Sequence, residues 1–453
     1  MFTFPQRAQA FSPGSNDLRV PTSWPSHRLK TLVRNVVEPD TDTGSRTYLA
    51  LEQVPSWSAI PRWAISIADG NRFTPDDVLF GKLRPYLAKV VKADRSGVCV
   101  GEFWVLRSIG DLTPPFTAVL LRSKPMIDLI TSTTYGAKMP RASWGVVGCL
   151  RVPVPPQDEQ RAIVKYLNHA HARINATITK KRKLIALLEE QKQALINQAV
   201  TRGLDPNVEM KDSGVPWLGE IPSHWEVLRV KTLFEDVDHR SEDGGEELLS
   251  VSHITGVTPR SEKNVTMFKA ETNVGHKVCR PGDLVFNTMW VWMGALGVSH
   301  HDGIVSPAYN VYRPVRADVD ADYYSSLFRT PSYVGAFASL STGITKSRLR
   351  FYPDDLAAMP TILPPMNEQK AIVSHINTRT ASIQRAITYT QREIDLLTEF
   401  RTRLTSDVVT GQVDVRSVAS TLPDLPDSDL SDLDESMEEP EEVDVDADIA
   451  DDE

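Results

Sequence analysis

The sequence has little cysteine and no long apolar segment. Its three cysteines, Cys99, Cys149 and Cys279, lie far apart without any CxxC spacing, which argues against a disulfide framework and against a zinc site. The longest apolar run, MWVWMGALGV from Met289, has ten residues, half of the ~20 that a membrane helix needs. The first residues, MFTFPQRAQAFSPG, lack the basic and then apolar order of a signal peptide. These absences favour a cytoplasmic protein.

Basic residues are absent from the C-terminal segment. Between Pro423 and Glu453 there are sixteen acidic residues and no lysine or arginine, a composition too polar to form a core, so we expect this tail to be disordered. The whole chain has a net charge of −9. Without the sixteen acidic residues of the tail, 43 acidic residues remain against 50 basic ones, so the rest of the chain is basic. A basic body is compatible with nucleic acid. Two roles for the tail stay open, a nucleic-acid mimic that tempers non-specific binding or a solubility tail.

One ten-residue phrase is present twice. PPQDEQRAIV begins at Pro155 and PPMNEQKAIV at Pro364, 209 residues later. At this offset, residues 155–205 match residues 364–414 at 20 of 51 positions. Fixed-offset similarity of this extent indicates an internal duplication.

The duplication extends upstream with a smaller offset, as expected if insertions accumulate in loops. The upstream matches are Trp24-x-x-x-Arg28 with Trp225-x-x-x-Arg229, PDDVLF at Pro75 with PGDLVF at Pro281, and Val105-x-Arg107 with Val311-x-Arg313. The chain therefore consists of two tandem halves, about 20–205 and 221–414.

Each well-matched segment predicts a long helix. Two prolines precede Asp158 and Asn367, both good N-cap residue types, and no proline or glycine follows up to residue 202 or 410. Apolar residues recur in both helices at close to heptad spacing. This seam consists of Ile163, Leu167, Ile174, Ile178, Ile185, Leu188 and Leu195 in the first copy and of Ile372, Ile376, Ile383, Ile387, Ile394, Leu397 and Leu404 in the second. A stripe ~65 Å long needs a partner, and we expect the two copies to pack as a coiled coil.

The remaining regions predict two α+β domains. Short β-rich runs (VLFGKL, GVCVGEFWVLR, DLVFNTMWVW and IVSPAYNVYR) alternate with turn signals and with brief helices such as residues 322–328. We expect a first α+β domain at 1–154, a long helix at 155–205, a linker at 206–220, a second α+β domain at 221–363, a second long helix at 364–414 and the acidic tail at 415–453. Two basic domains on a rigid spacer suit the reading of two separated sites on one polymer.

Several segments together point to a known family. They are the two PPxxEQ helix starts, SGVPWLGEIPSHWEVLRVKTL at 213–233, DDVLFGKLRPYLAKV at 76–90, GEFWVLR at 101–107 and GAKMPRASW at 136–144. On these residues the chain resembles the specificity (S) subunit of type I restriction–modification enzymes, over about residues 20–415. The second α+β domain matches less closely, and the acidic tail lies outside the family pattern.

The resemblance implies a non-catalytic DNA-binding protein. In this family two target-recognition domains each read one half of an asymmetric bipartite DNA site. The long helices form an antiparallel coiled coil that sets the gap and docks two methyltransferase (M) subunits, and a restriction (R) subunit adds the translocase and nuclease. S-adenosylmethionine, ATP and Mg²⁺ are then expected on the partner subunits, and no cofactor or metal in this chain.

Catalytic motifs should then be missing from this chain. No GxxxxGK[ST] phosphate loop is present. The nearest match to the Asn/Asp/Ser-Pro-Pro-Tyr/Phe loop of an adenine methyltransferase is residues 113–116, Thr-Pro-Pro-Phe, whose threonine supplies neither the amide nor the carboxylate. The ten histidines form no ligand-like cluster.

DNA contacts are expected from basic and aromatic residues of the two domains. Arginine and lysine hold phosphates or pair with guanine, and asparagine pairs with adenine. The candidates are Lys82, Arg84, Tyr86, Lys138 and Arg141 in the first domain and Asn287, Trp290, Trp292, Lys346, Arg348 and Arg350 in the second. Gly136 and Arg141 have the same spacing as Gly343 and Arg348, which favours a shared role. The alternative is that half of these side chains are ordinary surface charge and that the tryptophans fill a core.

Three further hypotheses stay open. The run Lys180–Lys183 is either a solvated helix face or a phosphate contact. Pro353-Asp354 with Glu368-x-Lys370 fits the loose metal-binding pattern of some nucleases. The main rival to DNA readout is a coiled-coil scaffold whose two domains bind proteins.

Overall fold

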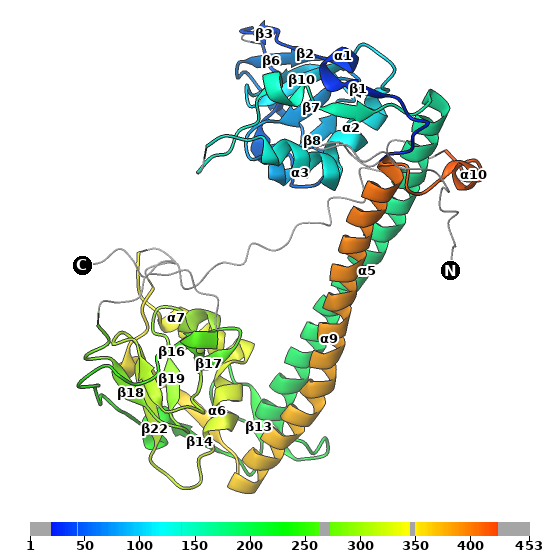
Figure 1. The fold of residues 1–453 in the computed structure, drawn as a ribbon. Helices are drawn as coiled ribbons and strands as arrows, with labels where there is room; N and C mark the ends of the chain where they lie inside the picture. The colour runs from blue at the N-terminus through cyan, green and yellow to red at the C-terminus, as the bar shows by residue number, and fades with distance from the viewer. Residues whose placement is uncertain (1–19, 43, 137, 263–271, 345–348, 425–453) are drawn as a thin grey trace. The chain divides into compact units, whose positions relative to one another are not determined.

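The chain forms two compact units (Figure 1). A computed structural model describes residues 20–42, 44–136, 138–262, 272–344 and 349–424. The first unit takes the chain up to Lys183 and again from Thr390, and the second runs from Leu184 to Tyr389. The acidic tail after Asp424 lies outside the described residues, so its disorder stays a prediction. Within the described ranges, no helix combines the length and the apolar character needed to cross a bilayer.

The first unit is built on a four-stranded antiparallel sheet and a second, five-stranded one. The first sheet has the order β2-β10-β7-β8 (Val33–Val36, Phe103–Ser108, Val78–Gly81, Val90–Lys92). The second has the order β3-β6-β9-β4-β5 (Pro39–Asp40, Gly70–Phe73, Gly97–Cys99, Arg46–Leu49, Ala64–Ser66). The two sheets share one core, in which Leu79 and Val105 of the first meet Leu49, Phe73 and Cys99 of the second. Because one hydrophobic core contains residues of both sheets, the two sheets belong to a single domain.

The second unit repeats the four-stranded sheet of the first. Its order is β15-β22-β19-β20 (Phe234–Asp236, Asn310–Pro314, Leu284–Phe286, Leu296–Val298). The register also repeats: Val105 lies opposite Leu79 in the first unit, and Val311 lies opposite Val285 in the second, each 206 residues further on. The strand pairs β16–β17 (Leu249–Ser252, Gly256–Pro259) and β18–β21 (Lys277–Cys279, Gly303–Val305) complete this domain. The duplication seen in the sequence therefore extends to the hydrogen-bond register of the sheets.

An ion pair between a buried aspartate and a half-exposed arginine recurs at the same place in both sheets. The guanidinium of Arg107 donates to both carboxylate oxygens of Asp77 at 2.8 Å, and that of Arg313 donates to Asp283 at 2.8 and 2.7 Å. Burial works to raise the pKa of Asp77, but hydrogen bonds from Arg107 and Thr74 lower it below its ordinary value. The repeated PDD/PGD and Val-x-Arg motifs are thus two ends of one contact, which explains why both recur.

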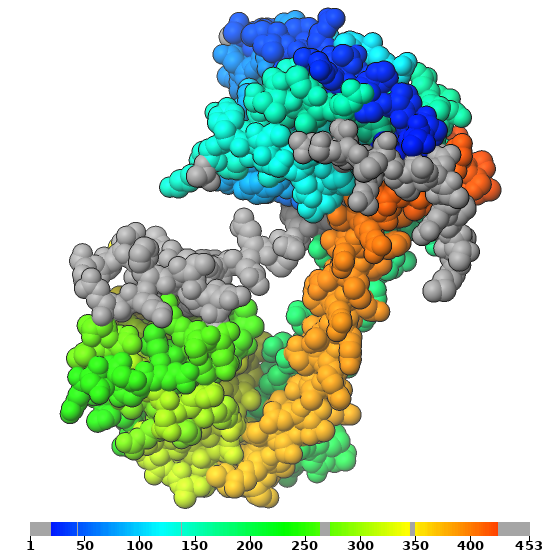
Figure 2. Space-filling model, viewed as in Figure 1, coloured from blue at the N-terminus to red at the C-terminus, as the bar shows by residue number. Residues whose placement is uncertain are grey.

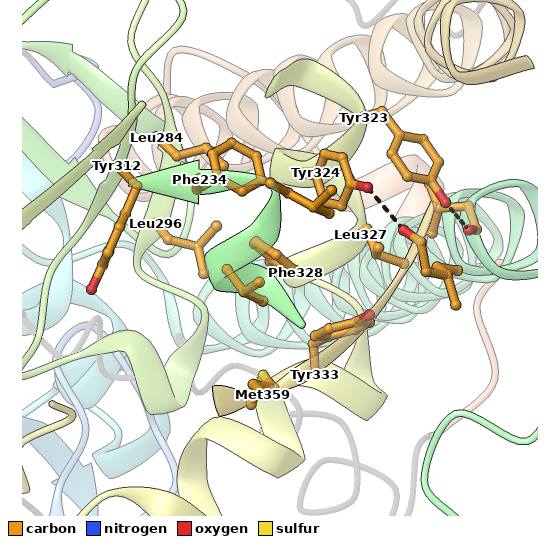
Figure 3. Close-up of a cluster of buried hydrophobic side chains, with 14 of the residues drawn as sticks. Phe234, Leu284, Leu296, Tyr312, Tyr323, Tyr324, Leu327, Phe328, Tyr333 and Met359 are labelled. Carbon is orange, nitrogen blue, oxygen red and sulfur yellow. Dashed lines mark hydrogen bonds between the residues drawn. The ribbon is translucent and has the colours of Figure 1, made fainter. Parts of the chain in front are cut away.

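Aromatic side chains dominate the core of the second unit (Figure 3). They come mainly from α6 (Ala321–Phe328) and α7 (Pro331–Leu340), where Phe328 and Tyr333 are fully buried. The Tyr323 hydroxyl donates to the Val200 carbonyl at 2.8 Å, and the Tyr324 hydroxyl donates to the Ile362 carbonyl at 2.9 Å. Because Val200 belongs to the first long helix, the hydroxyl of Tyr323 anchors the end of that helix to this core.

The two long helices are α5 (Gln157–Arg202) and α9 (Met366–Val409). Each begins one residue before the expected cap, so Asp158 and Asn367 lie in the first turn. In the first unit, contacts between the helices join His171 to Thr405 at 2.9 Å, Asn175 to Arg401 at 2.8 Å and Lys181 to Glu393 at 2.7 Å. In the second unit Lys192 donates to Gln384 at 2.9 Å. In the first unit partner numbers fall as α5 numbers rise, which shows antiparallel pairing there.

The fourteen residues of the expected apolar seam lie on these two helices. Each of its fourteen expected residues is buried or half-buried, and Leu167 and Ile372 are 1% exposed. Leu187 and Leu396, which lie outside the seam, are 53% and 56% exposed. Figure 2 shows α9, in orange, against the green atoms of α5. The heptad spacing thus separates the packed apolar residues from the exposed ones.

Two segments differ from the expectation. The linker contains an antiparallel strand pair, β12 (Met210–Asp212) with β13 (Glu220–Pro222), and Trp217 packs edge-on against Tyr333 at 4.8 Å between ring centroids. The run DLVFNTMWVW forms a strand only as far as Phe286 and then turns into the 3₁₀ helix η5 (Val291–Met293). Both segments contain tryptophans that pack against aromatic rings, Trp217 against Tyr333 and Trp290 against Trp292. Secondary-structure propensities do not include such tertiary contacts.

Proline in place of Ile174 should break α5. Ile174 is 8% exposed and lies in mid-helix, where proline removes a hydrogen bond and clashes with the preceding turn. We expect the free energy of unfolding to fall by ~3 kcal/mol more than in Ile174→Ala, which removes the side chain but keeps the helix. Urea denaturation followed by circular dichroism measures both variants. Equal losses in the two variants would contradict a continuous helix at this position.

Candidate nucleic-acid interface

In the first turn of each long helix, a glutamate accepts a hydrogen bond from a tryptophan indole. The Trp24 indole donates to the Glu159 carboxylate at 3.1 Å, and the Trp225 indole donates to Glu368 at 3.0 Å. Glu368 is also 2.7 Å from the imidazole of His224. Each carboxylate thus joins the start of a long helix to the start of its own domain.

This engagement removes the basis of the nuclease hypothesis. The Glu368 carboxylate is occupied by Trp225 and His224, and its counterpart Glu159 makes the same indole contact without any lysine two residues on. Asp354 lies in the first turn of α8 (Pro353–Ala358). Among the described residues, no group of three histidine, cysteine or acidic side chains could hold a metal ion. Asp354 and Glu368 thus lie in the first turns of two different helices, α8 and α9, which are separated by the strand β23 (Pro360–Leu363).

The next residue of the repeated phrase is a glutamine that is fully buried in both copies. The Gln160 amide donates to the carbonyls of Asp111 and Pro155 at 2.8 Å, and its oxygen accepts from the Thr113 backbone at 2.9 Å. Gln369 repeats this pattern with Asp318, Pro364 and Asp320. Thr113 precedes α2 (Pro114–Arg122), so the methyltransferase-like residues 113–116 are a helix start. We call this contact of glutamate and glutamine with the domain the EQ joint.

The far end of each long helix reaches the opposite domain's joint. After α5, Gly203 adopts φ +77° beside Trp225, and after α9, Gly411 adopts φ +71° beside Trp24. A Cβ at position 411 would come within 2.7 Å of the Trp24 ring, so only glycine fits there. Each tryptophan therefore contacts the start of one long helix and the end of the other within its unit.

The five DNA-contact candidates of the first domain come together in space. The loop 82–88, which contains the 3₁₀ helix η2 (Pro85–Leu87), runs beside the hairpin 135–142. The Ala142 amide donates to the Lys82 carbonyl at 2.9 Å, and the Arg84 amide donates to Pro140 at 2.8 Å. The hairpin, in cyan, projects from the globular part of this unit (Figure 1). Lys82 is half-buried, and the other four candidates, Arg84, Tyr86, Lys138 and Arg141, are exposed.

Backbone strain is concentrated in the loop 82–88. Four described non-glycine residues have clearly positive φ, and two of them, Arg84 at 48° and Ala88 at 49°, bound η2. A third, Trp57 at 61°, donates its amide to the Leu87 carbonyl at 3.0 Å. Each such conformation costs ~1–3 kcal/mol and persists only where its surroundings impose it. Backbone hydrogen bonds to residues 57, 140 and 142 hold the loop in this conformation.

The second domain builds the same loop with different side chains. Gly294, at φ +85°, ends η5 as Ala88 ends η2, and Phe351 donates to Thr288 at 3.0 Å as Ala142 donates to Lys82. At the same offset of 206 residues, Lys82, Arg84 and Tyr86 therefore correspond to Thr288, Trp290 and Trp292, respectively. The two tryptophan rings stack at 5.7 Å between centroids, and Trp290 is 8% exposed. This agrees with the alternative that the tryptophans fill a core.

Asn287 and Arg350 lie in contrasting surroundings. Asn287 is 1% exposed, and its amide donates to the Tyr309 hydroxyl at 3.0 Å, so it presents no edge to a ligand in this arrangement. Arg350 is exposed and exchanges backbone hydrogen bonds with Thr342 at 2.9 and 3.0 Å, as Arg141 does with Tyr135.

This pairing corrects the expected correspondence between the two hairpins. Arg350, and not Arg348, occupies the position of Arg141, because the second hairpin is two residues longer than the first. Lys346 and Arg348 lie outside the described residues. In the run Lys180–Lys183, Lys181 forms an ion pair with Glu393, and phosphate contact by the run stays a prediction.

Sequence reasoning missed Glu102, whose carboxylate accepts from Arg141 at 2.7 Å. It lies in the turn before β10 and is the second residue of the segment GEFWVLR, but an acidic residue gave no signal in a search for basic contacts. Only the tertiary structure brings it to the hairpin.

The EQ joint predicts a matched pair of stability effects. Gln160→Ala removes one amide and leaves buried groups at residues 111, 113 and 155 without a partner, at a cost of ~1–3 kcal/mol for each unsatisfied group. The exposed Gln157, in the same helical turn, provides the control substitution Gln157→Ala. We expect a loss of at least ~2 kcal/mol in unfolding free energy for the first variant and little change for the second. Similar values for both would contradict the joint.

Comparison with known proteins supports the resemblance to type I specificity subunits. No protein-family model matches the chain. The type I restriction enzyme EcoKI specificity subunit of Escherichia coli K12 is 21% identical over 331 residues, covering 68% of this chain and 69% of that protein. The MjaVIII specificity subunit of Methanocaldococcus jannaschii is 29% identical over 106 residues, 23% of each chain.

A solved structure has the same fold. It comes from work on complex assembly and conformational transition of the type I R-M system, and it matches with a TM-score of 0.68 at 17% identity, over 88% of this chain and all of that one. Alignments span 23–69% of the curated relatives' length. The expected mixed helix and sheet fold is confirmed, and with it the resemblance: in sequence this chain is similar to the specificity subunits of type I restriction enzymes, and its fold matches a structure from a type I R-M system.

Proposed function

We propose that this chain is the DNA sequence-specificity subunit of a type I restriction–modification complex. Each recognition domain reads one half of an asymmetric bipartite DNA site, and the paired helices α5 and α9 set the gap between the halves. Two methyltransferase subunits dock on the chain, and restriction subunits join through them. The chain itself performs no chemistry.

One observation carries this proposal: the two domains place different side chains on the same backbone frame. The sheet register, the Asp–Arg pair and the EQ joint are duplicated. The loop that follows β7 or β19 differs, with arginine and tyrosine exposed in one copy and two stacked tryptophans in the other. A repeated frame with altered contact loops suits a protein that reads two unlike half-sites. A scaffold would need neither the strained loop nor its basic side chains.

A methylation map tests the proposal directly. The chain is expressed with its neighbouring methyltransferase subunit in a methylation-free host, and methyladenine is mapped against the same cells without the chain. We expect a motif of two short blocks with a fixed gap, present only with the chain. Methylation without the chain, or none despite a folded and assembled complex, would reject the proposal and favour the scaffold.

Arginines on the two hairpins should act on separate half-sites. Arg141→Ala should weaken DNA binding by ~1–3 kcal/mol if the side chain contacts a base, with the loss confined to one block of the motif. Arg350→Ala, at the corresponding position of the second hairpin, should affect the other block. Binding titrations with DNA altered in one block at a time measure both effects. Loss at both blocks from a single substitution would contradict one domain per half-site.

A further inference from the structure

Two exposed arginines of the first domain have different electrostatic surroundings. Arg141, with 45% of its side chain exposed, is held by Glu102 through a 2.7 Å hydrogen bond. Arg84 lies on the neighbouring loop, and within the described ranges it forms no ion pair. The two cations therefore differ in whether an acid restrains them.

Glu102 is an unexpected residue for this position. Its backbone carbonyl accepts from the Lys82 amide at 2.9 Å, so it is adjacent to the loop that carries Lys82 and Arg84. One carboxylate oxygen binds Arg141, and the other is buried without a hydrogen-bond partner among the described residues. A carboxylate beside the candidate contact face repels DNA phosphates, and leaving an oxygen unpaired costs free energy. A specific task for this side chain explains both costs.

We infer that Glu102 is a positioning residue that orients Arg141 toward the edge of a guanine. The inference rests on the proposed function. A guanidinium has five N–H donors, and the bond to Glu102 uses one of them, which leaves enough for a bidentate contact with guanine O6 and N7. The nearby negative charge weakens phosphate binding by Arg141, whereas Arg84 has no such restraint and suits a phosphate. Holding the side chain in advance also reduces the entropy lost on binding.

In the described part of the second domain, no carboxylate is paired with the corresponding arginine, Arg350. The position that corresponds to Glu102, at the same offset of 206 that relates Val105 to Val311, is Ala308. Arg350 therefore has no counterpart of the Glu102 carboxylate. The difference predicts that the effect of Glu102 is restricted to the block read by the first domain.

The test substitutes Glu102 in the full chain assembled with its methyltransferase partner. Glu102→Gln keeps the shape but removes the charge, and Glu102→Ala removes the contact. The methylation motif is mapped for each variant, and binding is titrated against the wild-type site and the three alternatives at every position of the first-domain block. Asp94→Asn is the control, because Asp94 is an exposed acid of the same domain that pairs with Arg95. Melting temperatures verify that the variants fold.

We expect one guanine position to lose about tenfold of its discrimination in Glu102→Ala and less in Glu102→Gln. The second block and the control variant should keep full discrimination, and affinity for non-specific DNA should stay equal or rise. Adding Glu102→Ala to Arg141→Ala should cause no further loss, because both act through one contact. An additive loss would show that Glu102 contacts a base itself and would overturn the inference.

Two other outcomes also overturn it. An equal change at all sequences would make Glu102 a general electrostatic residue, and unchanged specificity would make the contact with Arg141 purely structural. If the wild-type chain directs no bipartite motif at all, the proposed function fails first and the inference fails with it.

Discussion

A buried glutamine at the start of each long helix is the contact on which the rest of the structure depends. The amides of Gln160 and Gln369 satisfy carbonyls and an amide that would otherwise be buried without partners, and the preceding glutamate holds a tryptophan indole. Because unpaired buried polar groups are costly, this joint permits few alternative geometries. It makes helix and domain one body, so that the direction of the helix is determined by the domain to which it is attached.

The joint explains why one part of each half is repeated closely and another is not. The glutamines of the joint and both residues of each Asp–Arg pair have specific hydrogen-bond partners, and a change in one residue leaves its partner unsatisfied. The loop beyond β7 or β19 has a duplicated backbone path, but its side chains contact little of the frame in the first domain. Arg84 and Trp290 can therefore differ completely at corresponding positions. A protein that must alter what it recognises while keeping its assembly benefits from this division.

Electrostatics distinguishes the contact loops from the general surface. The chain up to residue 422 has only a small basic excess, so net charge alone says little about where nucleic acid would bind. Local arrangement is more informative: Arg84, Lys138 and Arg141 lie on adjoining segments, and a single acid, Glu102, restrains one of them. The carboxylate of Glu102 lowers the general affinity of this surface for DNA, but it fixes the orientation of the Arg141 side chain.

The sequence by itself determined the duplication, the two long helices, their apolar seam and the family resemblance, because each depends on residues that recur at a regular spacing or a constant offset. It also placed Arg141 among the candidate contacts. Only the tertiary structure decided that Arg350 corresponds to Arg141, that Asn287 is buried, that Glu368 binds Trp225 and His224, and that Glu102 reaches Arg141. These facts depend on contacts between segments that are far apart in the chain. Two additional residues in the second hairpin change which arginine occupies a given position, and no local sequence pattern reveals such a change.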